Sequence, residues 1–328
     1  MASGGGRPDP VPAPELVEWC RRHLGAPAVE RFFGADHLSA VHGLRLDDGR
    51  AVVLKVRWPD PRLRGCGVVH RIVHAAGVPC PPPLTGPHPI DTPDGERWCS
   101  AEGWVPGGRR APDGDVAVQY AQLAARIVAI GPSPGAVPSL APPPGWVWFD
   151  HDAPDRVWPP AATPQWDPHR IEAELPPFLV EAARRSRARL LADDARALPD
   201  VVAHVDLSGF NVRWFPPYEP GGPWRPLVHD WDSVAARSDA VVAGVVAADH
   251  ASLEAERLAT VDDSARVVDE YARVRGRAFT AAEREVAWAA GVWVSAYNAA
   301  FEHLHGAAGP VTAALGEQLD ERLARAGA

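Results

Sequence analysis

Short apolar runs with strand-like alternation dominate the first hundred residues of the chain. The expected strands are 28–33, 39–46, 51–57 and 97–102. Asp48-Gly49 stands between two of these runs and is typical of a hairpin turn. Helices are expected at 15–24 and 66–76, the second ending where a run of prolines cannot continue it. The pattern therefore predicts a small β-rich unit with one or two helices.

Beyond residue 110 the apolar positions recur with helical spacing. The expected helices are 115–130, 176–197, 240–258, 264–275, 281–305 and 311–326. Thr280 and Glu283 have the spacing of a capping box at the start of the longest of them. Between 200 and 233 two short β-like runs interrupt the helices, and carboxylates follow both runs. Strands that lead into carboxylates within a helical region indicate a functional site.

The composition excludes several classes of protein. A chain of 328 residues with 46% hydrophobic side chains can bury a sizeable core, which excludes general disorder. No apolar stretch is long enough to cross a bilayer, and the first residues have no secretory pattern, so neither a signal nor a membrane anchor is expected. The four cysteines lack metal-binding or disulfide-scaffold spacing, which favours a reducing cytoplasm. An acidic chain without a basic cluster is not expected to bind nucleic acid.

The charge divides the chain unevenly. Residues 1–103 are balanced, so the whole net charge of −9 belongs to residues 104–328. An acidic surface would attract a cationic small molecule and speed encounter. Solvated acidic helices explain the same charge equally well, and both interpretations remain open.

Four polar residues carry the candidate chemistry. Asp206 and Asn211 lie five residues apart after one β-like run, and Asp230 follows the next. Magnesium prefers oxygen ligands, which Asn211 and Asp230 offer, while Asp206 could accept the proton of an attacking alcohol. Lys55 is the only lysine among 33 basic residues and lies within an apolar strand, where it could hold nucleotide phosphates. The alternatives are a solvated strand lysine and an ordinary polar turn, because Asp and Asn favour turns.

The spacing of these residues resembles a known family. His204-Val-Asp206 followed by Asn211, a hydrophobic strand and Asp230-Trp-Asp232 is similar to the aminoglycoside phosphotransferase family of kinase-like enzymes. The run around Lys55 resembles its nucleotide-lysine strand, and the agreement extends over roughly residues 28–305. The resemblance implies an α+β, two-lobed protein-kinase-like fold with a β-rich N-lobe at 15–103 and a mainly helical C-lobe at 104–328. Residues 1–14 would form a disordered tail.

The resemblance also implies roles and partners. Lys55 would bind the phosphates of ATP, Asp206 would be the catalytic base, and Asn211 and Asp230 would bind Mg²⁺. His204 would brace the loop. A hinge at 102–105 would meet adenine through its backbone, with Gly103 and Val105 as the contact residues. The partner would be a small-molecule hydroxyl acceptor, such as an amino sugar or amino alcohol, and the sequence leaves the oligomeric state open.

Two departures from the family pattern keep a second function in view. Between Val56 and Cys80 the only carboxylate is Asp60, so the helix glutamate that pairs with the lysine is absent near Cys66. The segment 34–43, expected to cover the phosphates, has few glycines. The alternative function is therefore a weak or inactive kinase-like module that binds nucleotide or ligand.

Overall fold

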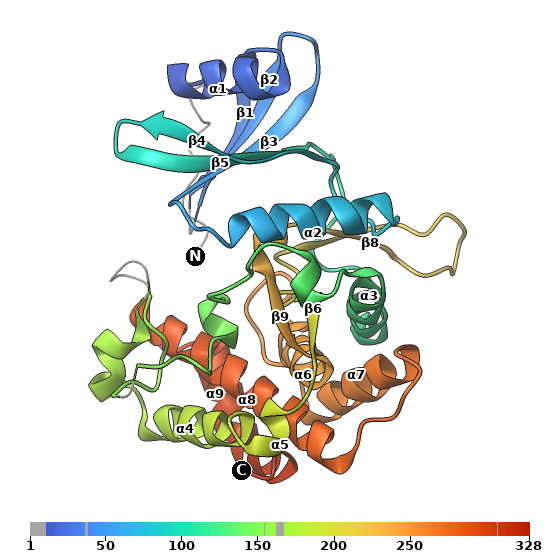
Figure 1. The fold of residues 1–328 in the computed structure, drawn as a ribbon. Helices are drawn as coiled ribbons and strands as arrows, with labels where there is room; N and C mark the ends of the chain where they lie inside the picture. Colours follow the sequence, from blue (N-terminus) through green and yellow to red (C-terminus); the bar gives the residue numbers. More distant parts are fainter. Residues whose placement is uncertain (1–10, 37–38, 154, 162–166, 307) are drawn as a thin grey trace. The chain divides into compact units, whose positions relative to one another are not determined.

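The computed structural model describes residues 11–328 except 37–38, 154, 162–166 and 307. The start of the predicted tail and part of the predicted phosphate-covering segment thus lie outside the described residues. The chain forms two compact units (Figure 1). The first runs to Gly107 and includes Val137–Leu140, and the second comprises Gly108–Ala136 and Ala141–Ala328.

The first unit is built on one antiparallel sheet. Its strands are β1 (Ala28–Asp36), β2 (Ala40–Leu46), β3 (Ala51–Arg57), β4 (Pro83–Thr92) and β5 (Gly95–Gly103), in the spatial order β1-β2-β3-β5-β4. The sheet therefore matches the predicted β-rich unit, with one addition. The sequence analysis did not predict β4, which contains three prolines, but β4 is an edge strand, where proline is tolerated.

Two helices pack against this sheet. Helix α1 (Pro14–Leu24) contributes Leu16, Trp19 and Cys20 to a core shared with Leu44 and Leu54 of the sheet. Helix α2 (Leu63–Ala75) contacts β4. The α2 sequence has no acidic residue, and its buried positions are apolar apart from His70.

The second unit is mainly helical. Its helices are α3 (Ala117–Ile130), α4 (Pro177–Leu190), α5 (Asp193–Arg196), α6 (Asp239–Asp249), α7 (Val261–Val274), α8 (Ala281–Leu304) and α9 (Pro310–Arg325). Its short strands are β6 (Asp200–His204), β7 (Val212–Phe215), β8 (Arg225–Val228) and β9 (Val234–Ser238). They form two small antiparallel sheets, β6-β9 and β7-β8. Each sheet pairs one strand from the first β-like run of the sequence with one strand from the second or directly after it.

Helices α6 and α8 form the centre of this unit. Both are buried over most of their length, and the backbones meet so closely that a Cβ on Gly244 would lie 1.9 Å from the carbonyl oxygen of Ala287. The capping box at Thr280 and Glu283 is confirmed. Two predicted helices were too long: 176–197 breaks between α4 and α5, and 240–258 ends at Asp249. In the second case the alanine- and glutamate-rich sequence favours a helix, but the chain turns away to meet the 206–211 loop.

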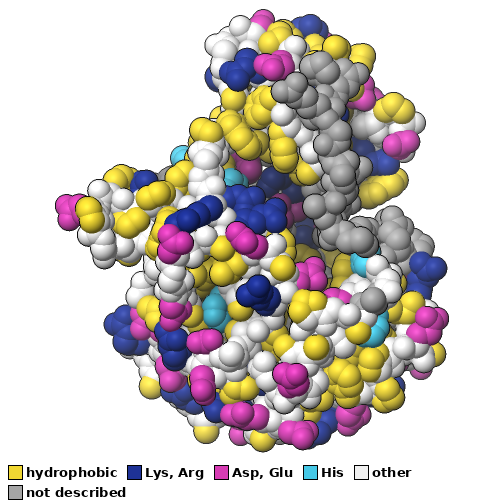
Figure 2. All heavy atoms as spheres, turned by 180° about the vertical axis from the view of Figure 1, so that it is seen from behind, with side chains coloured by type: hydrophobic (Ala, Val, Ile, Leu, Met, Phe, Trp, Pro, Cys, Tyr) yellow, Lys and Arg dark blue, Asp and Glu magenta, His cyan; other side chains and the backbone are white. Residues whose placement is uncertain are grey.

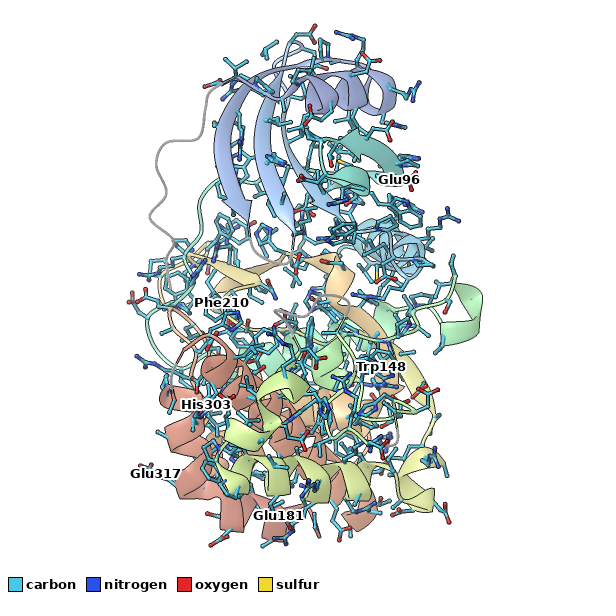
Figure 3. All side chains as sticks on the ribbon, turned by 90° about the vertical axis from the view of Figure 1, so that its left-hand side faces the viewer. Glu96, Trp148, Glu181, Phe210, His303 and Glu317 are labelled. Carbon is cyan, nitrogen blue, oxygen red and sulfur yellow. The ribbon has the colours of Figure 1, made fainter. Side chains whose placement is uncertain are left out.

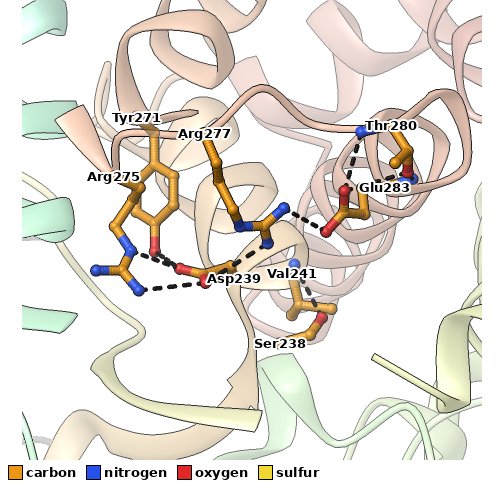
Figure 4. Close-up of polar contacts among 8 residues, drawn as sticks. All are labelled: Ser238, Asp239, Val241, Tyr271, Arg275, Arg277, Thr280 and Glu283. Carbon is orange, nitrogen blue, oxygen red and sulfur yellow. Dashed lines mark hydrogen bonds and ion pairs between the residues drawn. The ribbon is translucent and has the colours of Figure 1, made fainter. Parts of the chain in front are cut away.

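A buried acidic residue ties α6 to α7. Asp239 begins α6 and accepts hydrogen bonds from the Tyr271 hydroxyl at 2.6 Å and the Arg275 Nε at 2.9 Å (Figure 4). Arg277 lies 3.7 Å away and bridges to Glu283. Burial alone would raise the pKa of Asp239, but the bonds from Arg275 and Tyr271 outweigh it and lower the pKa below 3.8.

We expect Asp239→Asn to destabilise the protein by about 2–3 kcal/mol, because it removes the buried anion that accepts the bonds of Tyr271 and of the half-buried Arg275. The pKa of Asp239 is lower in the folded state than in the unfolded state. The carboxylate therefore contributes stability above pH 4 that is lost as the pH falls through the folded value. Urea unfolding at several pH values measures both effects. Asp269→Asn, which removes an exposed partner of Arg284, should cost less than about 1 kcal/mol; equal losses in the two variants would contradict the assignment.

No helix within the described ranges is long and apolar enough to span a membrane. On the face drawn in Figure 2, acidic and basic side chains are interspersed over the larger unit and do not form a patch of one sign. The net negative charge of residues 104–328 is thus spread thinly on that face.

Candidate active site

The loop from 205 to 211 connects β6 to β7 and is folded by its own side chains. The Asn211 amide nitrogen donates to the Asp206 carbonyl oxygen at 3.1 Å. Ser208 Oγ accepts from the Phe210 amide at 3.3 Å and lies 3.5 Å from Asp206 Oδ1. Because the Asn211 nitrogen is engaged, its amide oxygen is the atom available to a cation.

A second loop follows β8 and is bonded to the first. The His229 amide donates to the Asn211 carbonyl at 2.7 Å, and the Val205 amide donates to the Ser233 carbonyl at 2.9 Å. His204 connects the loops through its ring, since Nε2 donates to the His229 carbonyl at 2.9 Å. That bond leaves Nδ1 as the acceptor for the Asp206 amide at 3.3 Å. His204 thus has the geometry of a brace for both loops.

Asp230 adopts a left-handed backbone, with φ 62° and ψ 52°. Within the described part of the chain it is the only residue other than glycine with positive φ. Such a conformation costs about 1–3 kcal/mol and persists where the surroundings require it, often at functional sites. The backbone outlier therefore coincides with a residue that the sequence analysis selected for its chemistry.

The end of α6 lies directly against the Asp206 loop. The Gly209 amide donates to the Ser252 carbonyl, and a Cβ on Gly209 would come within 2.3 Å of the Leu253 Cα. Only glycine fits this contact. It brings Asp249, the last residue of α6, within hydrogen-bonding reach of the Asp206 carboxyl group.

The carboxyl groups of Asp206 and Asp249 both have raised pKa values. Burial, followed by the charges of Asp249 and Asp230, raises the pKa of Asp206 well above its usual range. Burial and the charge of Glu256 raise the pKa of Asp249 to about 6, although its hydrogen bond with Asp206 opposes the change. Mutually repelling carboxylates in one place are stabilised by a cation.

The donor set fits a magnesium ion that takes part of its coordination from other groups. No cluster of three or more His, Cys, Asp or Glu with metal-binding geometry occurs among the residues described. Magnesium usually binds one or two protein oxygens and completes its shell with phosphates and water. The amide oxygen of Asn211 and the carboxylate of Asp230 suit that arrangement.

In the other unit, Lys55 on β3 has an acidic partner. Its Nζ lies 3.6 Å from Glu102 Oε2, and only 11% and 9% of the two side chains are exposed. Lys55 pairs with Ser100 of β5, so Glu102 lies two residues further along on the same face of the sheet. The partner that α2 lacks is thus supplied by a neighbouring strand.

The predicted hinge begins at the end of β5. The Gly103 amide donates to the Pro82 carbonyl at 2.9 Å, and the Trp104 amide to the Ala51 carbonyl at 3.0 Å. These two donors are therefore used within the sheet. The Val105 amide makes no hydrogen bond to the part of the chain that the structure describes, which leaves it available to a ligand.

Of the residues selected from the sequence, Asp206, Asn211 and Asp230 are brought together in the second unit, and Lys55 lies in the first. The sequence analysis did not select Glu102 or Asp249. Glu102 had no signal in the sequence, because its place beside Lys55 depends on the pairing of β3 with β5. Asp249 had no signal, because the sequence placed it in the middle of a helix.

The fold of the chain resembles that of several solved structures, although no protein-family model and no curated protein sequence matches it. An aminopropanol kinase associated with a microcompartment has a TM-score of 0.60 at 14% identity, covering 94% of this chain and 93% of its own. An amicoumacin kinase with AMP-PNP and Ca²⁺ has 0.57 at 13%, covering 90% and 88%. A spectinomycin phosphotransferase with ADP and spectinomycin has 0.57 at 11%, covering 98% and 99%.

The chain has the fold of the aminoglycoside phosphotransferases. The predicted kinase-like fold, with its antiparallel sheet and its helical part, is thereby confirmed. The similarity in fold covers at least 90% of the chain in each of the three structures named above.

Proposed function

We propose that the protein transfers the γ-phosphate of ATP to a hydroxyl group of a small molecule. The observation that carries the proposal is the pair of cross-bonded loops that hold Asp206, Asn211 and Asp230 together in a chain with a small-molecule kinase fold. Phosphoryl transfer needs an oriented hydroxyl and neutralised phosphate charge, and these residues have the chemistry for both.

Each residue has a defined task in this function. Asp206 orients the acceptor hydroxyl and takes its proton. Asn211 and Asp230 hold magnesium, which neutralises charge on the phosphates when bound. Lys55, oriented by Glu102, binds the nucleotide phosphates, and the Val105 amide donates to the base. The Gly103 contact is limited to its carbonyl, since its amide is already bonded.

We further propose that the acceptor carries an amine. Asp249 lies beside Asp206, and its raised pKa shows a carboxylate that a nearby cation would stabilise. An aminopropanol kinase and a fructosamine kinase among the similar structures fit this choice.

The test is a phosphotransfer assay with ATP and magnesium over paired acceptors, each amino alcohol or amino sugar beside its deaminated analogue. Transfer to amines, with weak transfer to the analogues, supports both parts of the proposal. Tight nucleotide binding without transfer to any acceptor would contradict the enzymatic function and favour a nucleotide-binding module.

For an amine acceptor that the protein phosphorylates, we expect Asp249→Asn to raise the KM about tenfold or more, because the partly buried pair between the Asp249 carboxylate and the amine is lost. The KM for the deaminated analogue should stay unchanged. In the wild type, KM for the amine should rise as the pH falls below about 6, where Asp249 becomes protonated. Glu254→Gln, an exposed change in the segment after α6, is the control. A KM change shared by both acceptors would contradict the role of Asp249.

A further inference from the structure

Two arginines of the second unit lie beside the Asp206 loop. Many arginines of the protein pair with a carboxylate, and the neighbouring Arg109 does so with Asp113 at 2.6 Å. Arg110 and Arg213 have no carboxylate partner anywhere in the described ranges. The chain as a whole has an excess of acidic side chains.

The backbone brings these two side chains to one place. Val212 and Trp214 of β7 point into the core, so Arg213 and Phe215 lie on the opposite face. The segment after the predicted hinge runs over that face: Arg109 and Trp214 exchange two backbone hydrogen bonds, and a Cβ on Gly108 would lie 2.9 Å from the Arg213 Cβ. Arg110 therefore emerges next to Arg213.

Both guanidinium groups reach the Asp206 loop. Arg213 Nη1 donates to the Gly209 carbonyl at 3.3 Å, and the Arg110 guanidinium carbon lies 5.2 Å from the centre of the Phe210 ring. Phe210 is 37% exposed and lies beside the β7-β8 strands (Figure 3). Gly209 and Phe210 belong to the loop between Asp206 and Asn211, so the two arginines adjoin the candidate active site.

The arrangement is unfavourable without an anion. Burial and the charge of Arg110 lower the pKa of Arg213, which means that folding disfavours its charged form. Arginine remains protonated nonetheless, and two such cations are stabilised by an oxyanion that both can bind.

We propose that Arg110 and Arg213 form a binding site for an oxyanion, a phosphate or carboxylate group of a ligand that also packs on Phe210. Guanidinium groups match the planar oxygens of phosphate and carboxylate, and the exposed ring beside them suits the uncharged part of the same ligand. The anion has two possible sources, the nucleotide phosphates or an acid group on the acceptor. Only this choice of source rests on the proposed function.

The site itself is tested by thermal unfolding of the full chain with inorganic phosphate, without magnesium and at constant ionic strength. Phosphate should stabilise the wild type and the matched control Arg109→Gln. In Arg110→Gln and Arg213→Gln its affinity should fall about tenfold or more. Without phosphate, Arg110→Gln should be as stable as the wild type or more stable, because a repulsion is removed.

If phosphate stabilises the wild type and the three arginine variants equally, the proposed site is wrong, because the ion then binds without Arg110 and Arg213. Lys55→Gln should retain the response. If it loses the response, the anion binds at the lysine and the proposal fails.

The source follows from ligand binding to Arg110→Gln. A loss of ATP affinity with unchanged adenosine affinity assigns the anion to the nucleotide. Unchanged nucleotide affinity with a raised KM for acidic acceptors assigns it to the acceptor. Phosphate binding can succeed when no phosphotransfer is found, so this site and the proposed function can fail separately.

Discussion

Asp206→Asn should lower the phosphotransfer rate by about a thousandfold while leaving the fold intact, because asparagine cannot accept the proton of the attacking hydroxyl. Asparagine keeps the shape of the side chain, and the backbone bonds from Asn211 and to His204 do not depend on the carboxylate. ATP affinity should change little. Rates under saturating ATP, with the acceptor found in the paired panel, measure the effect.

The stability of this variant separates lost chemistry from lost structure. Burial and the charges of Asp249 and Asp230 disfavour the ionised carboxylate in the folded protein. Removing that charge should therefore leave the melting temperature unchanged or raise it, since active-site residues are often held at a cost in stability. Asp193→Asn, an exposed change in the same unit, should alter neither quantity. Activity within tenfold of the wild type would remove Asp206 from the chemistry.

Glu102→Gln should lower kcat/KM for ATP by about ten- to a hundredfold, which corresponds to ~1.4–2.7 kcal/mol. Glutamine is nearly the same size as glutamate but lacks the charge that holds the Lys55 ammonium at 3.6 Å. The neighbouring Cys80 thiol has a pKa raised to about 12, by burial and then by Glu102 itself, which indicates a poorly solvated environment where such a pair is strong. The stability loss should be about 2 kcal/mol.

A matched control lies on the same strand. Glu96 is exposed on β5 (Figure 3), and Glu96→Gln should leave ATP kinetics and stability unchanged. Because Lys55 is the only lysine, an amine-reactive reagent followed by peptide mapping reports on it directly. Loss of the carboxylate should speed that labelling, and ATP should slow it in the wild type. Wild-type ATP kinetics in Glu102→Gln would show that the pair is only structural.

The features that could be predicted from the sequence depend on residues close together along the chain. Asp206, Asn211 and Asp230 are set by local spacing on strands and loops, so their pattern was readable. The hairpin turn between β2 and β3 and the Thr280 capping box are local in the same way. Helix α8 kept its predicted bounds almost unchanged because apolar periodicity specified it.

The features that sequence did not predict depend on distant partners. Strand β4 forms because β5 offers an edge, although its prolines are poor strand formers. Helix α6 ends at Asp249 because the following turn bonds to Gly209, some forty residues earlier in the chain. The Lys55–Glu102 pair depends on the register of β3 and β5, which becomes known only when the sheet is assembled.

The Lys55–Glu102 pair has a consequence for α2. In protein kinases the corresponding helix carries the glutamate, and its displacement controls the lysine. Here α2 is anchored by His70 at the Pro81 carbonyl and by Arg64 stacked on Trp98, while the lysine is held from strand to strand. Among the described residues, the carboxylate beside the Lys55 ammonium is therefore carried by the sheet, and its position depends on the register of β3 and β5 rather than on a residue of α2.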